Sequence, residues 1–441
     1  MTQTQSAPPA TWSPAAPAGT AVQAPAPGPA GRGAVARWFD GTPGRMRAFL
    51  ILAAAMSVVF GLAAAQGFQQ SDGALQRAQD NAAQLVRIQA IHTNLVSANA
   101  DATNAFLVGG LEPPGQRQQF VDSLAAAAGL IAEAATAQPA DRDALGALNK
   151  TLITYEGLIE QARANNRQGL PIGSQYLKDA NSVLQNDSLP LVKALVDANE
   201  KRVGTEFDGV GYGTIWVIAG GVLTLLIFAL TLRWLARRTH RYLNVPIAAG
   251  GVLVLLTTVI GGVLLAGASS AANDTNHGAY DRTVGLSRAR IAAYDARSNE
   301  SLTLIARGSG DSFDKAYNAS AGEVLNQVDK LGDSALQSQW LTYGTVHKYI
   351  RDQDSKGQWD NAVSIAIGQA KTPYSTDSVT AFDQFDSTSD QRLQEASSAV
   401  QGKLGDARTG LAPLGWLGLA VGIAAALLVA WGMSQRLEEY R

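Results

Sequence analysis

The stretch PIAAGGVLVLLTTVIGGVLLAGASSAA, from Pro246 to Ala272, decides the fold because it contains no charged side chain. A helix rises about 1.5 Å per residue, so roughly 20 apolar residues cross a bilayer core with every backbone group satisfied internally. Three further uncharged runs have this length, at 48–68, 214–232 and 411–433. A globular core rarely tolerates about 18 successive uncharged residues. The sequence therefore predicts an all-α membrane protein with four transmembrane helices.

Arginines mark one side of the predicted membrane. They precede the first span, fill the link between the second and third spans, and follow the fourth: Arg32, Arg37, Arg45, Arg47, Arg233, Arg237, Arg238, Arg241 and Arg436. Positive charge beside the spans is typical of the cytoplasmic side. The pattern predicts a multi-pass protein of the cell membrane. Both termini (1–47 and 434–441) and the link 233–245 are then cytoplasmic, and the segments 69–213 and 273–410 are exported.

The region before the first span is rich in proline and alanine, and its composition predicts a disordered tail. Near its end, Trp38 and Phe39 lie among arginines that include Arg45. These side chains, with Arg237 and Arg238 of the link, are candidates for contact with lipid headgroups or with a cytoplasmic partner. The run 63–65 (Ala-Ala-Ala) also resembles a signal-peptidase site, but the preceding region is far longer than a usual signal segment, so we expect the first span to remain as an anchor.

Composition argues against several classes of function. Cysteine is absent and the net charge is −2, which favours neither a disulfide framework nor a nucleic-acid partner. The histidines do not show metal-ligand spacing, and no phosphate loop or nucleophile elbow occurs; they are His92, His240, His277 and His347. We therefore expect no cofactor, no metal and no enzymatic activity.

The spans themselves lack Asp, Glu, Lys, Arg and His, which argues against an ion-coupled transporter. Small residues recur four apart at Gly418 and Gly422 and at Gly262 and Ala266. Such pairs allow helices to approach closely, either within the chain or between two copies, so a homodimer is compatible with the sequence.

Each exported segment carries the pattern of a four-helix bundle. From Leu75 to Ala105 apolar residues recur every three or four positions, which predicts one long amphipathic helix. Glycine and proline then separate helices at 118–138, at 141–168 and from about 174, the last bent near Pro190. The second segment predicts helices at 280–307, 312–331, 336–356 and 377–408. The outer helices of each bundle are expected to continue into spans, which gives a tandem span–bundle–span arrangement.

The two bundles share a short internal match. Residues 153–169 align without a gap with residues 341–357, with Thr, Tyr, Arg and Gly at the same offsets. We favour duplication of one unit over two unrelated amphipathic bundles. The matched residues Tyr155 and Arg163, and Tyr343 and Arg351, are candidates for a ligand or partner surface because Tyr and Arg are enriched where proteins recognise one another. The alternative is a half-buried core tyrosine with a solvated arginine.

A disordered tail, the motif Trp-Phe-Asp-Gly-Thr-Pro-Gly at 38–44, two exported bundles and an Arg-rich link together resemble the GlnX family of four-span actinobacterial membrane proteins. The resemblance implies that the chain connects a glutamate- and aspartate-binding lipoprotein, GlnH, outside the cell to the cytoplasmic Ser/Thr kinase PknG, and so adjusts 2-oxoglutarate metabolism. The bundles are also similar to the four-helix ligand domains of chemoreceptors. The chain lacks the HAMP and methylated helices of those receptors, which argues against a chemotaxis role.

The leading hypothesis is thus a transmembrane signal transducer that passes an amino-acid signal, through a solute-binding lipoprotein, to a cytoplasmic Ser/Thr kinase. A small piston or rotation of the continuous helices would carry the signal. The alternative is a scaffold or envelope-organising protein without ligand-driven change. An enzyme or transporter would instead require a polar pocket in a bundle or a polar path between the spans.

Overall fold

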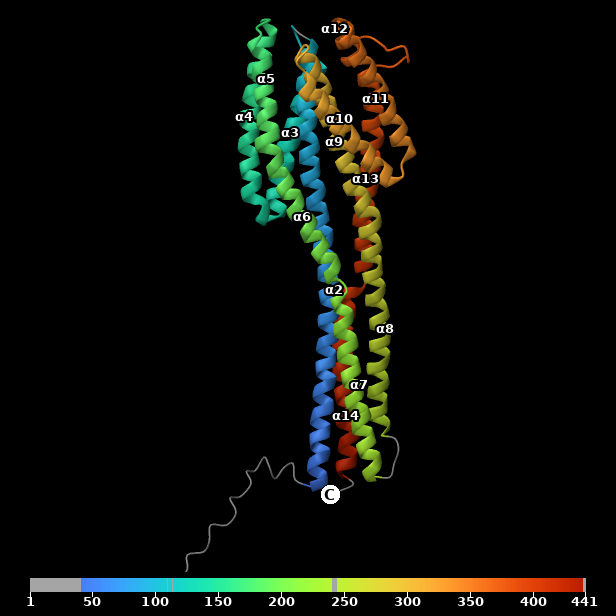
Figure 1. Ribbon diagram of the computed structural model, residues 1–441. Helices are drawn as coiled ribbons and strands as arrows, with labels where there is room; N and C mark the ends of the chain where they lie inside the picture. Colours follow the sequence, from blue (N-terminus) through green and yellow to red (C-terminus); the bar gives the residue numbers. More distant parts are fainter. Residues whose placement is uncertain (1–40, 109, 113, 240–243, 439–441) are drawn as a thin grey trace, which may run out of the picture.

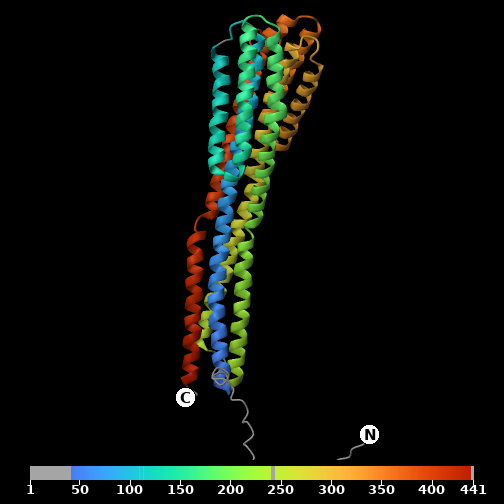
Figure 2. The same ribbon diagram turned by 90° about the vertical axis from the view of Figure 1, so that its left-hand side faces the viewer.

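The computed structural model describes residues 41–108, 110–112, 114–239 and 244–438, and these form helices connected by short turns, with no strand among them. The molecule is a long rod with a stem at one end and two groups of helices at the other (Figures 1 and 2). The expected all-α class is confirmed. Residues 1–40, which hold most of the predicted tail, lie outside the described part of the chain.

Four helices form the stem: α2 (Gly41–Val108), α7 (Tyr212–Thr239), α8 (Val245–Thr275) and α14 (Leu411–Glu438). They lie in the order α2, α7, α8, α14, and α14 closes the ring against α2. Large apolar side chains face outward; Val263 and Leu427, for example, are 67 % and 66 % exposed. An outward apolar surface is what lipid-facing helices require.

Helices α2 and α14 approach each other closely in the stem. A Cβ atom at Gly422 would lie 2.5 Å from the Cα of Gly61, and one at Gly418 would lie 2.8 Å from the Cβ of Ala64. The small residues at 418 and 422 therefore serve packing within the chain. Ala266, in contrast, is exposed on α8.

Lobe 1 consists of the outer half of α2 together with six shorter helical segments. These are α3 (Pro114–Ala137), η1 (Pro139–Asp141), α4 (Arg142–Arg167), α5 (Ile172–Val183), the π-helical turn η2 (Leu184–Ser188) and α6 (Leu189–Gly209). The π turn ends two residues before Pro190, the site of the predicted bend. Proline has no N–H to donate and its ring clashes with the preceding turn, and a wider π turn accommodates that clash.

Lobe 2 follows α8 through another π-helical turn, η3 (Asn276–Tyr280). Its helices are α9 (Asp281–Ile305), α10 (Asp311–Leu331), α11 (Ser334–Ser355), α12 (Trp359–Ala366) and α13 (Ser378–Arg408). Four of the five coincide with predicted helices. The short helix α12 lies in what the sequence predicts as a connection. Its two helical turns, flanked by Gly357 and Gly368, both at positive φ, have too few residues to show a period.

The two lobes share α2, so their cores are not independent. One face of α2 contributes Ile88, Ile91 and Leu95 to the core of lobe 1. Another face contributes Val96 and Ala100 to the core of lobe 2, where they pack with α9 and α13. The same helix runs without a break to the far end of the stem.

Five helices of the described chain are long and apolar enough to cross a membrane by length and composition. Four of them contain the stem helices, and the fifth is α3 in lobe 1. These helices are compatible with a multi-pass membrane protein. The predicted link 233–245 is mostly helical, because α7 extends to Thr239 and α8 begins at Val245.

Candidate functional site

The two matched tyrosines lie inside the lobes. Tyr155 of α4 and Tyr343 of α11 are both fully buried. The Tyr155 hydroxyl donates to Asn99 Oδ1 at 3.2 Å, whereas the Tyr343 hydroxyl has no partner in hydrogen-bonding geometry. Burial raises the pKa of both phenols well above the ordinary value, so both stay protonated. A direct role in binding a ligand or partner stays a prediction.

The two matched arginines lie nearer the surface and form ion pairs. Arg163 pairs with Glu160 at 2.8 Å and with Glu112 at 3.1 Å, and its guanidinium lies 4.2 Å from the ring centroid of Phe120. Arg351 pairs with Asp314 at 2.9 Å and with Asp354 at 2.5 Å. The four sequence-predicted residues therefore form two separate sites, one in each lobe.

The structure extends the internal match beyond the aligned identities. Five buried positions of α4 and α11 coincide at the same offset, as the pairs Leu148 and Leu336, Leu152 and Trp340, Tyr155 and Tyr343, Ile159 and His347, and Ala162 and Ile350. Gly169 and Gly357, which end these helices, both have positive φ, at 68° and 76°. Only glycine adopts this left-handed conformation without strain, which explains the shared glycine.

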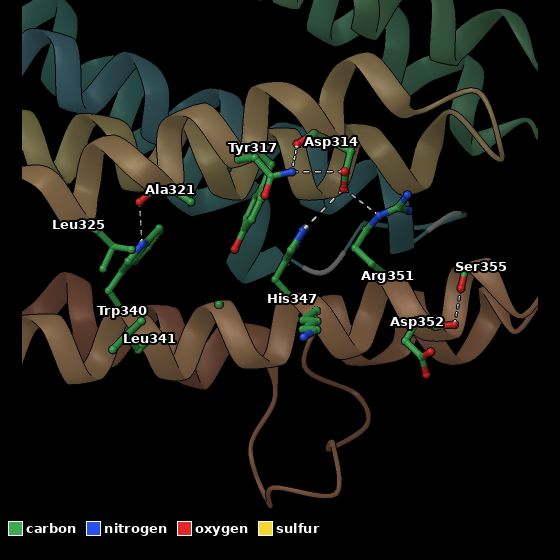
Figure 3. Close-up of a pocket in the computed structure, with 13 residues that line it drawn as sticks. Asp314, Tyr317, Ala321, Leu325, Trp340, Leu341, His347, Arg351, Asp352 and Ser355 are labelled. Atoms are coloured by element: carbon green, nitrogen blue, oxygen red, sulfur yellow. Dashed lines mark hydrogen bonds and ion pairs between the residues drawn. The ribbon is translucent and has the colours of Figure 1, made fainter.

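A groove of about 640 Å³ opens between α10 and α11 of lobe 2 (Figure 3). At one end its wall is apolar and includes Leu325, Trp340 and the exposed Leu341. The indole Nε1 of Trp340 is held by the carbonyl of Ala321 at 3.2 Å. The other end is charged and includes Arg351.

The charged end of the groove is built around His347. Its Nδ1 lies 2.8 Å from Glu300 Oε2, and its Nε2 lies 3.9 Å from Asp314 Oδ1. Its ring stacks on Tyr317 with the centroids 3.4 Å apart. Glu300 is 2 % exposed and accepts a second hydrogen bond from the Ser378 hydroxyl at 2.6 Å. This network joins α9, α10, α11 and α13. A displacement of the His347 ring would therefore alter contacts with the three other helices.

A second groove, of about 580 Å³, lies at the tip of lobe 2, and Arg351 lines both grooves. The second groove lies beside the turn 306–310, where Arg307 has φ 41° and its guanidinium lies 3.9 Å from the ring centroid of Trp359. A non-glycine residue in this conformation is held there by its surroundings. Together the grooves offer carboxylate, guanidinium and aromatic surfaces to a small polar ligand or to a side chain of a partner protein.

Beside the matched arginine of lobe 1, the described residues line a much smaller cavity. There Ile159 replaces His347, and the cavity beside Arg163 measures about 20 Å³. A water molecule needs roughly 10–15 Å³ of such volume, so this cavity holds little more than one. Arg351 therefore lines a groove, whereas Arg163 lines only a small cavity.

Sequence reasoning missed Glu300, Asp314 and His347. A signal for His347 does exist, because it lies four residues after Tyr343 and four before Arg351, on the same face of the helix. Its partners Glu300 and Asp314 come from other helices and leave no local signal. No group of three or more potential metal ligands occurs in the described residues.

The remaining candidate residues lie at the far end of the stem or outside the part of the chain that the structure describes. Arg45, at the start of α2, and Arg237, near the end of α7, are both exposed at the same end of the molecule. Trp38 and Phe39 lie outside the described residues. Arg238 is in helix α7, but its side chain lies outside the described part.

One comparison with known proteins bears on function. A family model described as an actinobacterial sensor domain matches residues 74–208, which correspond to lobe 1 from the outer half of α2 through α6. No curated protein and no solved structure shows a significant match to the chain. The match and the long apolar helices fit a sensor-type membrane protein of actinobacteria.

Proposed function

We propose that this chain is a transmembrane signal transducer with four spans, two exported lobes and both termini in the cytoplasm. The surroundings of α3, the fifth apolar helix, support the proposed count of four spans. Helix α3 packs against the outer half of α2, which carries Asn94 and Asp101, and it contains Arg117, Asp122 and Glu133. Charged groups at membrane depth are costly, so α3 belongs to the exported lobe.

The observation that carries the proposal is the path of α2. This helix of 68 residues contributes to both lobe cores and then runs unbroken through the stem to the end that carries Arg45. Two of the other outer helices are interrupted: a break at 210–211 separates α6 from α7, and Gly410, at φ 86°, lies between α13 and α14. The third, α8, continues through the π turn η3 into α9 and enters lobe 2 alone. A shift of α2 caused by either lobe is therefore passed directly to the inner end.

For the signal itself we propose an amino acid, glutamate or aspartate, delivered by a solute-binding lipoprotein, with a cytoplasmic Ser/Thr kinase as the output. The GlnX-like tail motif, span pattern and exported lobes support these partners, and the sensor-domain match supports a signalling role. The lobe 2 grooves are the proposed contact site outside. The exposed Arg45 and Arg237 are the proposed contact sites inside.

A scaffold without ligand-driven change is the second candidate, favoured by the well-filled Leu, Ile and Ala core of lobe 1. We propose no enzymatic role. The pair His347 and Glu300, which acid–base chemistry would need, is buried and bridges helices in lobe 2.

Topology is tested by cysteine labelling, because the chain has no cysteine of its own. A membrane-impermeant thiol reagent applied outside the cell is expected to label Asn165→Cys and Ser355→Cys but not Thr239→Cys. The opposite pattern would invert the molecule and remove the proposed sensor.

The relay is tested by bending α2 at the exposed Gln69, where the stem meets the lobes. Gln69→Pro removes a backbone N–H and clashes with the preceding turn, whereas Gln69→Ala leaves the helix intact. In a gene-deletion strain grown on glutamate or aspartate, we expect Q69A to restore phosphorylation of the kinase substrates and Q69P to fail at equal membrane abundance. Equal rescue by both variants would favour the scaffold.

A further inference from the structure

The groove between α10 and α11 contains space that the surrounding side chains do not fill. Gly344, in the middle of α11, lines this groove, and a Cβ atom added there would meet no other atom within 4 Å. Glycine inside a helix is less favourable than alanine, and at this position neither a positive φ nor a close neighbour requires it. The absence of a side chain at 344 therefore keeps the floor of the groove open.

A buried hydroxyl beside this space lacks a hydrogen-bond partner. Tyr317 of α10 lines the groove and is 4 % exposed, and its hydroxyl has no partner in hydrogen-bonding geometry. The ring is fixed by stacking on His347, and both side chains lie between the two helices (Figure 3). A buried hydroxyl without a partner is unfavourable, so a ligand atom that hydrogen-bonds to it gains affinity.

The charged side chains of the groove favour an anionic ligand. Its acids are already paired, Asp314 with Arg351 at 2.9 Å and Asp352 with Lys356 at 2.6 Å. Lys348 also lines the groove, and it has no ion-pair partner among the described residues. An anion near Lys348 forms a new ion pair, whereas a cation would have to displace an existing one.

The other end of the groove suits an apolar group. Leu325, Trp340 and the 53 % exposed Leu341 form its wall. The volume of about 640 Å³ lies within the range of roughly 300–1,000 Å³ that is usual for small-molecule sites, and such sites combine apolar walls with a few placed polar groups. The groove therefore matches a ligand that has an apolar body and an acidic group.

We propose that the groove between α10 and α11 binds a small amphipathic carboxylic acid. Its apolar body lies over Gly344, against Trp340 and Leu341. Its carboxylate accepts a hydrogen bond from the Tyr317 hydroxyl and pairs with Lys348. The proposal deepens the proposed function, because it assigns a ligand class to one of the two grooves, and it rests on that function only for the outward orientation. Binding to the purified chain requires neither the lipoprotein nor the kinase, so a failure to bind would leave the proposed relay standing.

The test measures binding by fluorine NMR on the full chain in lipid nanodiscs. Because the chain has no cysteine, a trifluoromethyl tag on Ser355→Cys reports on the charged end of the groove, and the same tag on the exposed Ile153→Cys of lobe 1 is the control. The probe is 3-phenylpropionate, compared with its uncharged amide and with propionate, which lacks the apolar ring. We expect 3-phenylpropionate to shift the signal at 355 saturably, with a Kd of about 1 mM or tighter, and the other two probes to bind about fivefold more weakly or worse.

Two variants, each with a matched control, make the test specific. Gly344→Phe fills the open floor and is expected to abolish the shift at an unchanged thermal midpoint, whereas Gly322→Phe, at an exposed position on α10 that also has open space, is expected to keep it. Lys348→Gln is expected to weaken binding of 3-phenylpropionate by about fivefold but not that of the amide, whereas Lys315→Gln, at an exposed position on α10, should change neither. The proposal is overturned by the absence of a saturable shift, by a shift that survives Gly344→Phe, or by equal effects of Lys348→Gln and Lys315→Gln.

Discussion

Removing one hydroxyl from each matched tyrosine should change stability in opposite directions. Tyr155→Phe deletes the donor of a 3.2 Å hydrogen bond to Asn99, an amide that also donates to Asn181 and Ser298. Tyr343→Phe deletes a hydroxyl that is fully buried and lacks a partner in hydrogen-bonding geometry. The two substitutions are chemically identical and lie at matched positions of α4 and α11, so each is the control for the other.

The magnitudes follow from the surroundings of each hydroxyl. A net intramolecular hydrogen bond contributes about 1 kcal/mol, and the Asn99 carbonyl left without its donor raises the cost of Y155F to about 1–2 kcal/mol. A buried hydroxyl without a partner carries a desolvation cost of about 1–3 kcal/mol, so Y343F should stabilise lobe 2 by about 1 kcal/mol after its lost packing is included. The expected difference between the variants is about 2–3 kcal/mol.

The assay is thermal unfolding of the full chain in detergent, followed by tryptophan fluorescence. At about 2–4 °C per kcal/mol for domains of this size, the midpoints of the two variants should differ by roughly 5–10 °C, with Y343F at or above the unmodified chain. If Y343F lowers the midpoint as much as Y155F, the Tyr343 hydroxyl has a partner, with the neighbouring Ser378 as the candidate. The description of this core as holding an unpaired hydroxyl would then be refuted.

Three further outcomes are expected. His347→Ala should lower the thermal midpoint by an amount equivalent to about 3 kcal/mol because it leaves the buried Glu300 carboxylate with only the Ser378 hydroxyl as a partner, and adding Glu300→Gln should recover most of that loss, in a double-mutant comparison. Gly422→Leu should destabilise the stem, whose α2 backbone would lie 2.5 Å from the new Cβ, whereas Gly267→Leu, with open space around it, should not; detergent-solubilised yield and thermal midpoint report both. The stability of the unmodified chain should fall as pH rises from about 4 to about 7, because the folded-state pKa of Asp101 lies above its unfolded value, and D101N should flatten that slope in a series of unfolding curves.

The helices were predictable because their signals are local. The three- and four-residue spacing from Leu75 to Ala105 describes the face of α2 that packs into lobe 1, and Gly169 marks the end of α4 through its backbone conformation. Proline and glycine placed the other helix ends within a few residues. The helix α12 was missed because two turns between glycines show no period.

The functional geometry was not predictable in the same way. His347 and Glu300 are in contact although they come from different helices, α11 and α9. A periodic pattern reveals which face of a helix is buried but not which helix covers that face. Tyr155 and Tyr343 have equivalent sequence positions, yet only Tyr155 has a hydrogen-bond partner, and this depends on Asn99 of α2.

By itself the sequence determined the helical class, the apolar runs that suit a membrane and the repeated unit, because hydropathy and helical period depend only on residues near one another in the chain. Tertiary structure alone decided that α2 belongs to both lobe cores, that a groove lies beside Arg351 but only a small cavity beside Arg163, and that Glu300 is buried against His347. Those properties depend on how separate helices pack, and packing brings together side chains that carry no information about one another along the sequence.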